Sequence, residues 1–362
     1  MASQPWTPSC IAPLIRDRDY LTDSHGTIFK VIGDTHPTTH YLGYVKYHPD
    51  RNGDRKLGGH IYRNNTVVAK SFGILANRPD YYVYSDALGC VITGVPRAKI
   101  TTHHSCRATL KMLASSPGTS TEIPVDNDLR AIIDQLSQAG LLHHFGITGS
   151  FLVGCFTPNS DIDLVCYGTA GYDAAQQLFA DSSLIRRYTG DALPALYRRR
   201  ARYMLGSDFS ALITQEQRKL QGLTPSGAHI NCEPLRDDDT RLDQPMSAKE
   251  IGEMSLLATI TDHSQGLATP ALYEIRAEHV LHSTIDDPHQ LIPHLAYLRS
   301  YLGAYTCAFR TGDTVHISGK LVHLHHHGTH QGFGIELTPW TSSASYLASL
   351  TTGQRTGPHP RS

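Results

Sequence analysis

The chain has 362 residues, of which 40% are hydrophobic and 18% are charged, and its formal net charge is −1. This length allows about two or three domains, and the composition is that of an ordinary globular protein without an apolar run long enough to cross a bilayer. The near-neutral charge argues against a protein that holds long nucleic acid through phosphate neutralisation alone, and seven cysteines without a CxxC pair indicate neither a disulfide framework nor a zinc site.

The N-terminal part of the chain, 1–115, is predicted to be a β-rich domain. Its first residues, MASQPWTPSC, lack the basic end and the apolar centre of a secretory signal, so we expect a cytoplasmic protein. The segments TIFKVIG, HYLGYVKYHPD and YYVYSDALGCVITGVP are rich in β-branched and aromatic residues, and RNGDRKLGG is a turn signal between them. These patterns predict a small, mostly antiparallel sheet, followed by the linker SSPGTSTEIP.

The middle part, 116–245, is predicted to be an α+β domain. Apolar residues recur at helical spacing after Asp126 and Asp128, either of which can cap the helix, and Gly140 ends the pattern. Next, FGITGS predicts a short strand ending in a tight turn, FLVGCF predicts one or two helical turns, and DIDLVCYG predicts a second strand. The elements therefore alternate between strand and helix in this part of the chain.

Two aspartates begin the second of these strands. Because side chains alternate along a strand, Asp161 and Asp163 are expected on one side, within about 7 Å of each other. Like charges at this separation are costly unless a positive charge lies between them, and carboxylate oxygens are ligands that Mg²⁺ prefers. The preceding Gly149 allows backbone to approach a phosphate, and Ser150 offers a hydroxyl and an N–H to the same anion. The pattern predicts a site for metal ions and a triphosphate.

The same residues resemble a known family. Gly149-Ser150 followed by Asp161-x-Asp163 is similar to the active-site signature of the DNA polymerase beta superfamily of nucleotidyltransferases. A looser resemblance, carried by RDRDYLTDSHGTIFKVIG, HPDRNGDRKLGG and SFLVGCFTPNSDIDLVCYG, extends over about residues 15–340 to a largely archaeal group described as predicted nucleotidyltransferases. The resemblance implies a polymerase-beta-like core, a mixed sheet with helices, flanked by further domains, and it brings no substrate with it.

A third acid and positive charge near the phosphates are further implications of the resemblance. In GAHINCEPLRDDD, alternation puts His229, Asn231 and Glu233 on one face, and Glu233 is the candidate third acid; the alternative is an ordinary surface acid at a strand end. Lys and Arg stabilise the charge that spreads over a transferring phosphoryl group. The basic segments YRRRARYMLG and TQEQRKLQG provide four candidate phosphate contacts, each of which could instead be a solvated helix residue: Arg198, Arg202, Arg218 and Lys219.

The C-terminal part, 246–345, again has strand patterns separated by turns, which predict a small β-barrel or sandwich, with an OB-like barrel as one form of it. The run HLHHHG, from His323 to Gly328, is interpreted as a strand end and turn rather than a metal site, because no carboxylate or cysteine lies at ligand spacing. The tail, 346–362, is rich in glycine, proline and polar residues and is predicted to be disordered.

These observations lead to one functional hypothesis with two alternatives. The chain is predicted to be a Mg²⁺-dependent enzyme that moves a nucleoside monophosphate from an NTP to a hydroxyl or phosphate of a small acceptor, with release of pyrophosphate. Two Mg²⁺ ions would be held by three acids, Asp161, Asp163 and Glu233. Nucleotide addition to an RNA such as tRNA is the first alternative, and a nucleotide-binding protein without catalysis is the second. No membrane partner is expected, and the sequence does not predict the oligomeric state.

Overall fold

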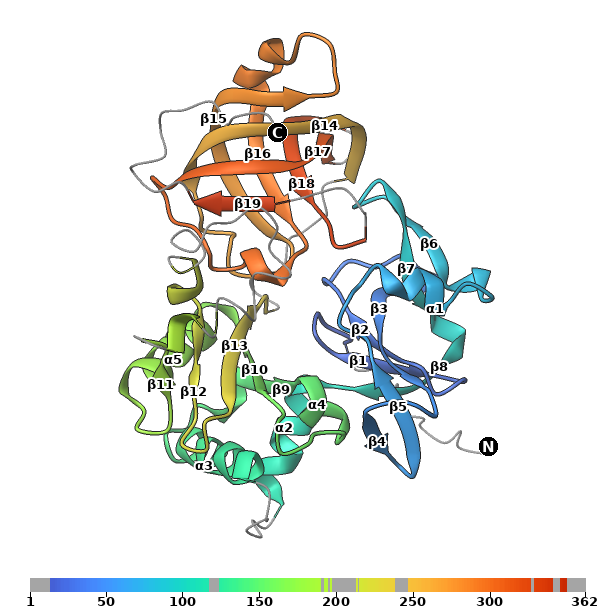
Figure 1. The fold of residues 1–362 in the computed structure, drawn as a ribbon, viewed down its shortest axis with the longest axis vertical. Coiled ribbons are helices and arrows are strands. Elements are labelled where there is room, and N and C mark those ends of the chain that lie inside the picture. The colour runs from blue at the N-terminus through green and yellow to red at the C-terminus, as the bar shows by residue number, and fades with distance from the viewer. Residues whose placement is uncertain are drawn as a thin grey trace, which may run out of the picture.

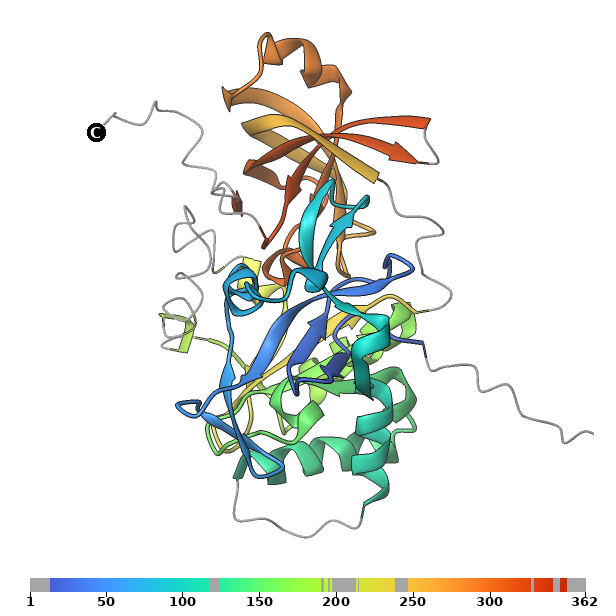
Figure 2. The ribbon, with the colours of Figure 1, turned by 90° about the vertical axis from the view of Figure 1, so that its right-hand side faces the viewer.

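The computed structural model describes residues 14–116, 124–189, 192–194, 196, 213, 215–237, 247–326, 329–340 and 346–349. The chain is a mixed α+β protein, as predicted, and its strands form three separate sheets. In Figure 1 the C-terminal sheet lies above, while the middle and N-terminal sheets lie side by side below it. Figure 2 shows the N-terminal sheet in front of the middle one, so the three parts surround a common centre.

The N-terminal sheet has eight strands and is antiparallel at every pairing that the structure records, as the alternating segments predicted. Short helical elements connect some of the strands: α1 (Lys70–Ile74) and the 3-10 turns η1 (Pro79–Tyr81) and η2 (Arg97–Lys99). The strands are β1 (Tyr20–Asp23), β2 (Ile28–Val31), β3 (His40–Pro49), β4 (Arg55–Leu57), β5 (His60–Asn64), β6 (Tyr82–Ser85), β7 (Cys90–Pro96) and β8 (Ile100–His104).

The middle sheet has five strands in the order β11-β12-β13-β10-β9. The central pair, β10 and β13, is parallel, and the other pairs are antiparallel. Its strands are β9 (Phe145–Thr148), β10 (Ile162–Tyr167), β11 (Arg186–Arg187), β12 (Leu220–Leu223) and β13 (His229–Leu235). Its helices are α2 (Cys106–Ser115), α3 (Pro124–Gln138), α4 (Gly149–Val153) and α5 (Gly168–Asp181), with the 3-10 turn η3 (Leu142–His144) before β9.

Helix α3 begins at Pro124, before both predicted caps, so Asp126 and Asp128 lie inside the helix and neither caps it. The ring of proline fixes φ near the helical value, and a first helical residue needs no N–H partner within the helix. Asp126 then lies in the first turn, where the helix dipole stabilises a negative charge. Gly140 follows the helix at φ +71°, a conformation that glycine adopts without strain, so the predicted end of the segment is confirmed.

The two faces of β10 have different partners. Ile162, Leu164 and Cys166 are fully buried in one apolar cluster with residues of α3 and α5. Val165 and Tyr167 alternate with them and pack in a second cluster, which includes residues of the N-terminal sheet. Burial of a large apolar side chain contributes about 1.5–3 kcal/mol, which makes a one-residue slip of this strand unfavourable. The aspartate side of β10 therefore faces the N-terminal sheet.

The C-terminal strands close into a ring. Strand β14 (Ser247–Asp262) pairs with both β15 (Ala271–Ser283) and β17 (Thr314–His326). The ring order is β14-β15-β16-β18-β17, and β16 (Leu295–Ser300) and β18 (Thr329–Leu337) are parallel. Two 3-10 turns, η4 (Pro288–His294) and η5 (Gly303–Tyr305), flank β16. Closure gives each of these five strands a neighbour on both sides over part of its length.

Two sequence predictions for this region have different outcomes. The histidine run does lie at a strand end, because β17 ends at His326 and β18 begins at Thr329. The predicted disordered tail begins with a strand instead: β19 (Tyr346–Ser349) pairs with β17 and extends the sheet. The hydrogen bonds that β17 offers along its outer edge explain this pairing, which a local composition rule does not take into account.

Arginine side chains connect the barrel to the other two sheets. Arg236, just after β13, donates to the carbonyl oxygens of Thr269 (3.1 Å) and Pro270 (3.0 Å). Arg299 of β16 donates to the carbonyl oxygen of Ala87 at 2.6 Å. In the part of the chain that the structure describes, no helix has the length and apolar character to cross a membrane.

Candidate active site

The Gly-Ser turn and the acidic strand lie against each other in the middle sheet. Gly149 begins α4 at φ +70°, directly after β9, and β9 pairs with β10 so that Thr148 is opposite Asp163. A Cβ atom at position 149 would overlap Oδ2 of Asp163 and lie 3.1 Å from its Cγ. Position 149 therefore requires glycine for its backbone conformation and for the space that the Asp163 carboxylate occupies.

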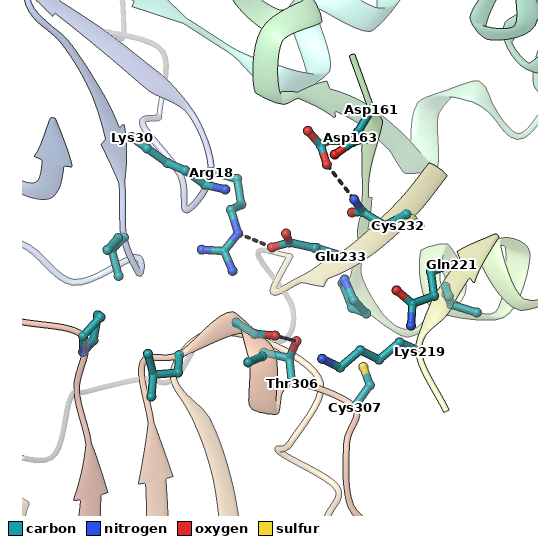
Figure 3. Close-up of a pocket in the computed structure, with 18 of the residues that line it drawn as sticks. Arg18, Lys30, Asp161, Asp163, Lys219, Gln221, Cys232, Glu233, Thr306 and Cys307 are labelled. Carbon is teal, nitrogen blue, oxygen red and sulfur yellow. Dashed lines mark hydrogen bonds and ion pairs between the residues drawn. The ribbon is translucent and has the colours of Figure 1, made fainter. Parts of the chain in front are cut away.

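Asp161 and Asp163 line the same cavity, which has a volume of about 350 Å³. Figure 3 shows their side chains together at one end of it, above side chains from the other two sheets. The cavity has three walls: the middle sheet, the N-terminal sheet with Arg18 and Lys30, and the barrel segment 301–307. A concave site of this size between domains is the usual setting for a small ligand.

A row of polar side chains crosses the middle sheet at the level of Asp163. On β13 its neighbour is Asn231, whose Nδ2 donates to Oδ1 of Asp163 at 2.6 Å. On β12 the next neighbour is Gln221, which is paired in register with Asn231. Asp163, Asn231 and Gln221 all line the cavity. The row gives the cavity one carboxylate followed by two neutral amides.

The predicted third acid lies beside the cavity but not beside Asp163. Glu233 is paired in register with Val165, two residues further along β13 than Asn231. Its Oε2 accepts a hydrogen bond from Nε of Arg18, which also makes an ion pair with it. The residue opposite Asp163 on β13 is thus the amide Asn231. The predicted acid, Glu233, is paired instead with Arg18, which lies just before β1.

Arg18 contacts all three parts of the molecule. It donates from Nε to Glu233 of the middle sheet and from Nη2 to Oγ1 of Thr269 in the barrel (3.2 Å), while Nη1 lies 3.3 Å from Oδ1 of Asp17. Its backbone has φ +71°, which is uncommon for a residue other than glycine. Strained backbone persists where surrounding contacts hold it, and it is frequent at functional sites.

Burial and neighbouring charge shift two pKa values at this point. Burial acts to lower the pKa of Arg18, but the carboxylates of Asp17 and Glu233 outweigh it and raise that pKa above its ordinary value. Burial raises the pKa of Asp17 to about 6, the Arg18 charge opposes this shift, and Asp34 adds to it. Arg18 is therefore charged at all working pH values, and Asp17 titrates in the slightly acidic range.

Two lysines line the cavity. Lys219 donates to Oε1 of Glu216 at 2.8 Å and extends into the cavity beside Gln221 (Figure 3). Lys30 of β2 comes from the opposite wall, and among the described residues no carboxylate forms an ion pair with it. Both lysines can approach an anion bound between the walls.

Of the other predicted basic residues, Arg218 is the one that the structure describes, and it does not line this cavity. Arg218 is adjacent to Lys219 but points to the barrel, where it pairs with both carboxylate oxygens of Asp313 and donates to the carbonyl oxygen of Ala308 (3.1 Å). Arg198 and Arg202 lie outside the described residues. Ser150 is buried in the first turn of α4 and is not among the described residues that line the cavity.

The donor set suits a hard divalent cation only in part. Asp161 and Asp163 offer carboxylate oxygens, which Mg²⁺ accepts as ligands, whereas Asn231 turns its amide nitrogen toward Asp163. Within the described ranges, however, no three His, Cys, Asp or Glu side chains converge as a ligand group. Glu233 is held by Arg18, so a third carboxylate would have to leave that arginine to reach a metal ion at Asp163.

Sequence inspection missed Arg18, Lys30, Gln221 and Asn231 as members of the site. Arg18 and Lys30 are in the RDRDYLTDSHGTIFKVIG segment, which carried part of the family resemblance but no assigned role. Asn231 was recognised as sharing a face with Glu233, and only the register with β10 shows that it is the direct neighbour of Asp163. The position of Gln221 depends on the pairing of β12 with β13.

Comparison with known proteins gives no further assignment. No protein-family model matches the chain, and no curated protein and no solved structure is similar enough to count as a match.

Proposed function

We propose that the cavity is the active site of a nucleotidyltransferase that moves a nucleoside monophosphate from an NTP to a small acceptor. The observation that carries this proposal is the contact between Gly149 and Asp163, which joins the glycine turn to a carboxylate in the cavity wall. The resemblance of Gly149-Ser150 and Asp161-x-Asp163 to the polymerase beta superfamily supports the same function, with a polymerase-beta-like core as its fold.

The roles of the side chains follow from where they lie. Asp161 and Asp163 would hold Mg²⁺, with the Asn231 amide fixing the orientation of Asp163. When bound, Mg²⁺ offsets charge on the attacking and leaving oxygens of phosphoryl transfer. Lys30 and Lys219 would contact the non-reacting phosphate oxygens from two sides of the cavity. A contact between Ser150 and the phosphates stays a prediction.

Glu233 and Arg18 would orient the acceptor. They meet where the middle sheet, the N-terminal sheet and the barrel come together. A hydroxyl or phosphate on the acceptor can bond to the same guanidinium that holds Glu233, which would place it next to the carboxylates. The barrel contributes Thr306 and Cys307 to the wall, so the acceptor would be enclosed on three sides, as suits a small molecule.

The test is release of pyrophosphate. The full-length chain is incubated with each of the four NTPs, a panel of small hydroxylated acceptors, and either Mg²⁺ or EDTA. Pyrophosphate that appears only with Mg²⁺ and acceptor supports the proposal. Saturable nucleotide binding without pyrophosphate release, for every acceptor in the panel, would contradict the proposal and indicate a nucleotide-binding protein without catalysis.

A non-catalytic nucleotide-binding protein is the second candidate, and one observation favours it. The neighbour of Asp163 on β13 is Asn231, and Glu233 is already paired with Arg18, so the site has two acids at its centre rather than three. Two carboxylates suffice to bind a metal–nucleotide complex. Catalysis also needs a group that accepts the proton of the attacking hydroxyl, and Glu233 is not free for this role while it is paired with Arg18.

Nucleotide addition to RNA is the third candidate. The strand order β14-β15-β16-β18-β17 and the parallel pairing of β16 with β18 support the prediction of an OB-like barrel, a type of fold that binds oligonucleotides in other proteins. The salt dependence of acceptor binding separates this candidate from the first. A steep fall of the logarithm of the binding constant with the logarithm of the salt concentration, equivalent to the release of several counterions, indicates RNA. Binding that is insensitive to salt indicates a small acceptor.

A further inference from the structure

We propose that Gln221 and Asn231 recognise the amino group of a nucleobase, so that the cavity selects nucleotides whose base carries an exocyclic amine. The inference rests on the proposed nucleotide site and adds the class of base that it takes. It follows from the fixed orientation of two neighbouring amides in the cavity wall.

The orientation of the Gln221 amide is set by Glu216. Nε2 of Gln221 donates to the backbone carbonyl oxygen of Glu216 and to its carboxylate Oε2, both at 2.8 Å. A flipped amide would place oxygen against two acceptors, so the nitrogen must lie on this side. Oε1 therefore points the other way, and in the described part of the chain no donor lies within hydrogen-bond distance of it.

The Asn231 amide is fixed in the same manner. Its Nδ2 donates to Oδ1 of Asp163 at 2.6 Å, and a flip would again set oxygen against a carboxylate. Oδ1 of Asn231 is buried, and it too has no hydrogen-bond donor among the described groups. A buried acceptor without a donor costs about 1–3 kcal/mol, which a ligand that supplies the donor would recover.

The two acceptors are neighbours: Asn231 is hydrogen-bonded directly to Asp163 of the proposed metal site, and Gln221 lies on the far side of Asn231. Gln221 and Asn231 are directly paired on β12 and β13, where Cβ atoms are about 4.5–5.5 Å apart. Gln221 is two strands from Asp163, or about 10 Å at normal strand spacing. Figure 3 shows Asp161 and Asp163 at one end of the cavity and Gln221 beside Lys219 at another. The phosphates and the base of one nucleotide can occupy these two ends.

The chemistry of paired acceptors selects the ligand. Two carbonyl oxygens accept both hydrogens of an amino group, and they repel a carbonyl group in the same place. Adenine and cytosine carry such an amine, while hypoxanthine and uracil have an oxo group at the same ring position. A site built to hydrogen-bond a donor rejects the analogue that lacks it, because the buried acceptors then stay unpaired.

The test compares matched nucleotide pairs on the full-length chain. Dissociation constants for ATP and ITP, and for CTP and UTP, are measured by calorimetry in the presence of Mg²⁺. We expect the amine-bearing member of at least one pair to bind about tenfold or more tightly than its oxo partner. Equal binding within both pairs, or preference for the oxo member, overturns the inference and leaves the proposed function standing. Failure of these four nucleotides and of GTP to bind overturns the proposed function as well.

Variants then assign the discrimination to these residues. Gln221→Met and Asn231→Val are each expected to reduce the preference to about threefold or less, because each removes one acceptor. Gln217→Met is the matched control, since Gln217 is exposed and lies four residues before Gln221. Discrimination that survives in both site variants, or that disappears in the control, overturns the assignment. The comparison on the unmodified chain decides the main point even if a variant does not fold.

Discussion

The acidic wall of the cavity and the wall opposite it are built in different ways. Asp161 and Asp163 are one residue apart, and a single strand with its glycine turn is enough to bring them together. The cationic wall uses Arg18, just before β1, and Lys30 of β2, which reach the cavity only because the N-terminal sheet packs against the middle one. The acids are therefore a local property of the sequence, and their counter-charges are a property of domain packing.

The largest expected effect comes from the acidic wall itself. Asp163→Asn keeps the size of the side chain but removes the charge that would hold Mg²⁺, so we expect turnover to fall by about 1000-fold or more with little change in the melting temperature. Pyrophosphate release and a thermal melt measure the two quantities. Asp173→Asn, an exposed position on α5, is the control. A rate near that of the unmodified protein would remove the proposed mechanism.

The next effect tests whether the local glycine turn is needed to position the carboxylate. Gly149→Ala would place a Cβ atom against Asp163, so we expect a rate loss of about 100-fold in addition to the backbone strain. Gly154→Ala is a matched control, because Gly154 has φ +72° and no atom within 4 Å of an added Cβ. Both variants should lose about 1–2 kcal/mol of stability from the left-handed backbone. Equal activity in the two variants would contradict a positioning role.

The buried carboxyl of Asp17, next to Arg18, predicts how the stability of the fold depends on pH. The pKa of Asp17 is about 6 in the folded protein, above its ordinary value of 3.8, because the carboxyl is buried. The folded state then binds the proton more tightly, so this group stabilises the fold below pH 4, and that contribution is lost as the pH rises to about 6. The difference between the folded pKa of about 6 and the ordinary value of 3.8 corresponds to about 3 kcal/mol of unfolding free energy.

Asp17→Asn should remove that part of the pH dependence. Thermal melts from pH 4 to pH 7 measure it, with Asp134→Asn, an exposed position on α3, as the control. We expect the variant to lose less stability than the unmodified chain over this interval. An unchanged slope in the Asp17 variant would show that another group is responsible.

The smallest effect concerns Lys30. Lys30→Met removes a cation that lines the cavity, so we expect nucleotide affinity to fall by about tenfold and the salt dependence of binding to weaken. Titration calorimetry at two salt concentrations measures both quantities. Lys56→Met, on the exposed face of β4, is the control. An unchanged affinity would mean that only the acidic wall and the barrel contact the nucleotide.

The sequence by itself determined the elements around the acids. Alternation along one strand predicted that Asp161 and Asp163 share a side, and the apolar residues that alternate with them fix that side, since Ile162 and Leu164 must be buried under α3 and α5. The positions of the helix that ends before Gly140 and of the strands on either side of Gly149 follow from the same local periodicities.

Tertiary structure alone decided what surrounds the acids. Alternation placed Asn231 and Glu233 on one face, but the register of β13 against β10 determines that the amide and not the acid lies beside Asp163. Arg218 and Lys219 are adjacent in sequence, yet Arg218 pairs with Asp313 of the barrel, while Lys219 lines the cavity. Register and domain packing depend on contacts between distant segments, and no pattern within a single segment contains them.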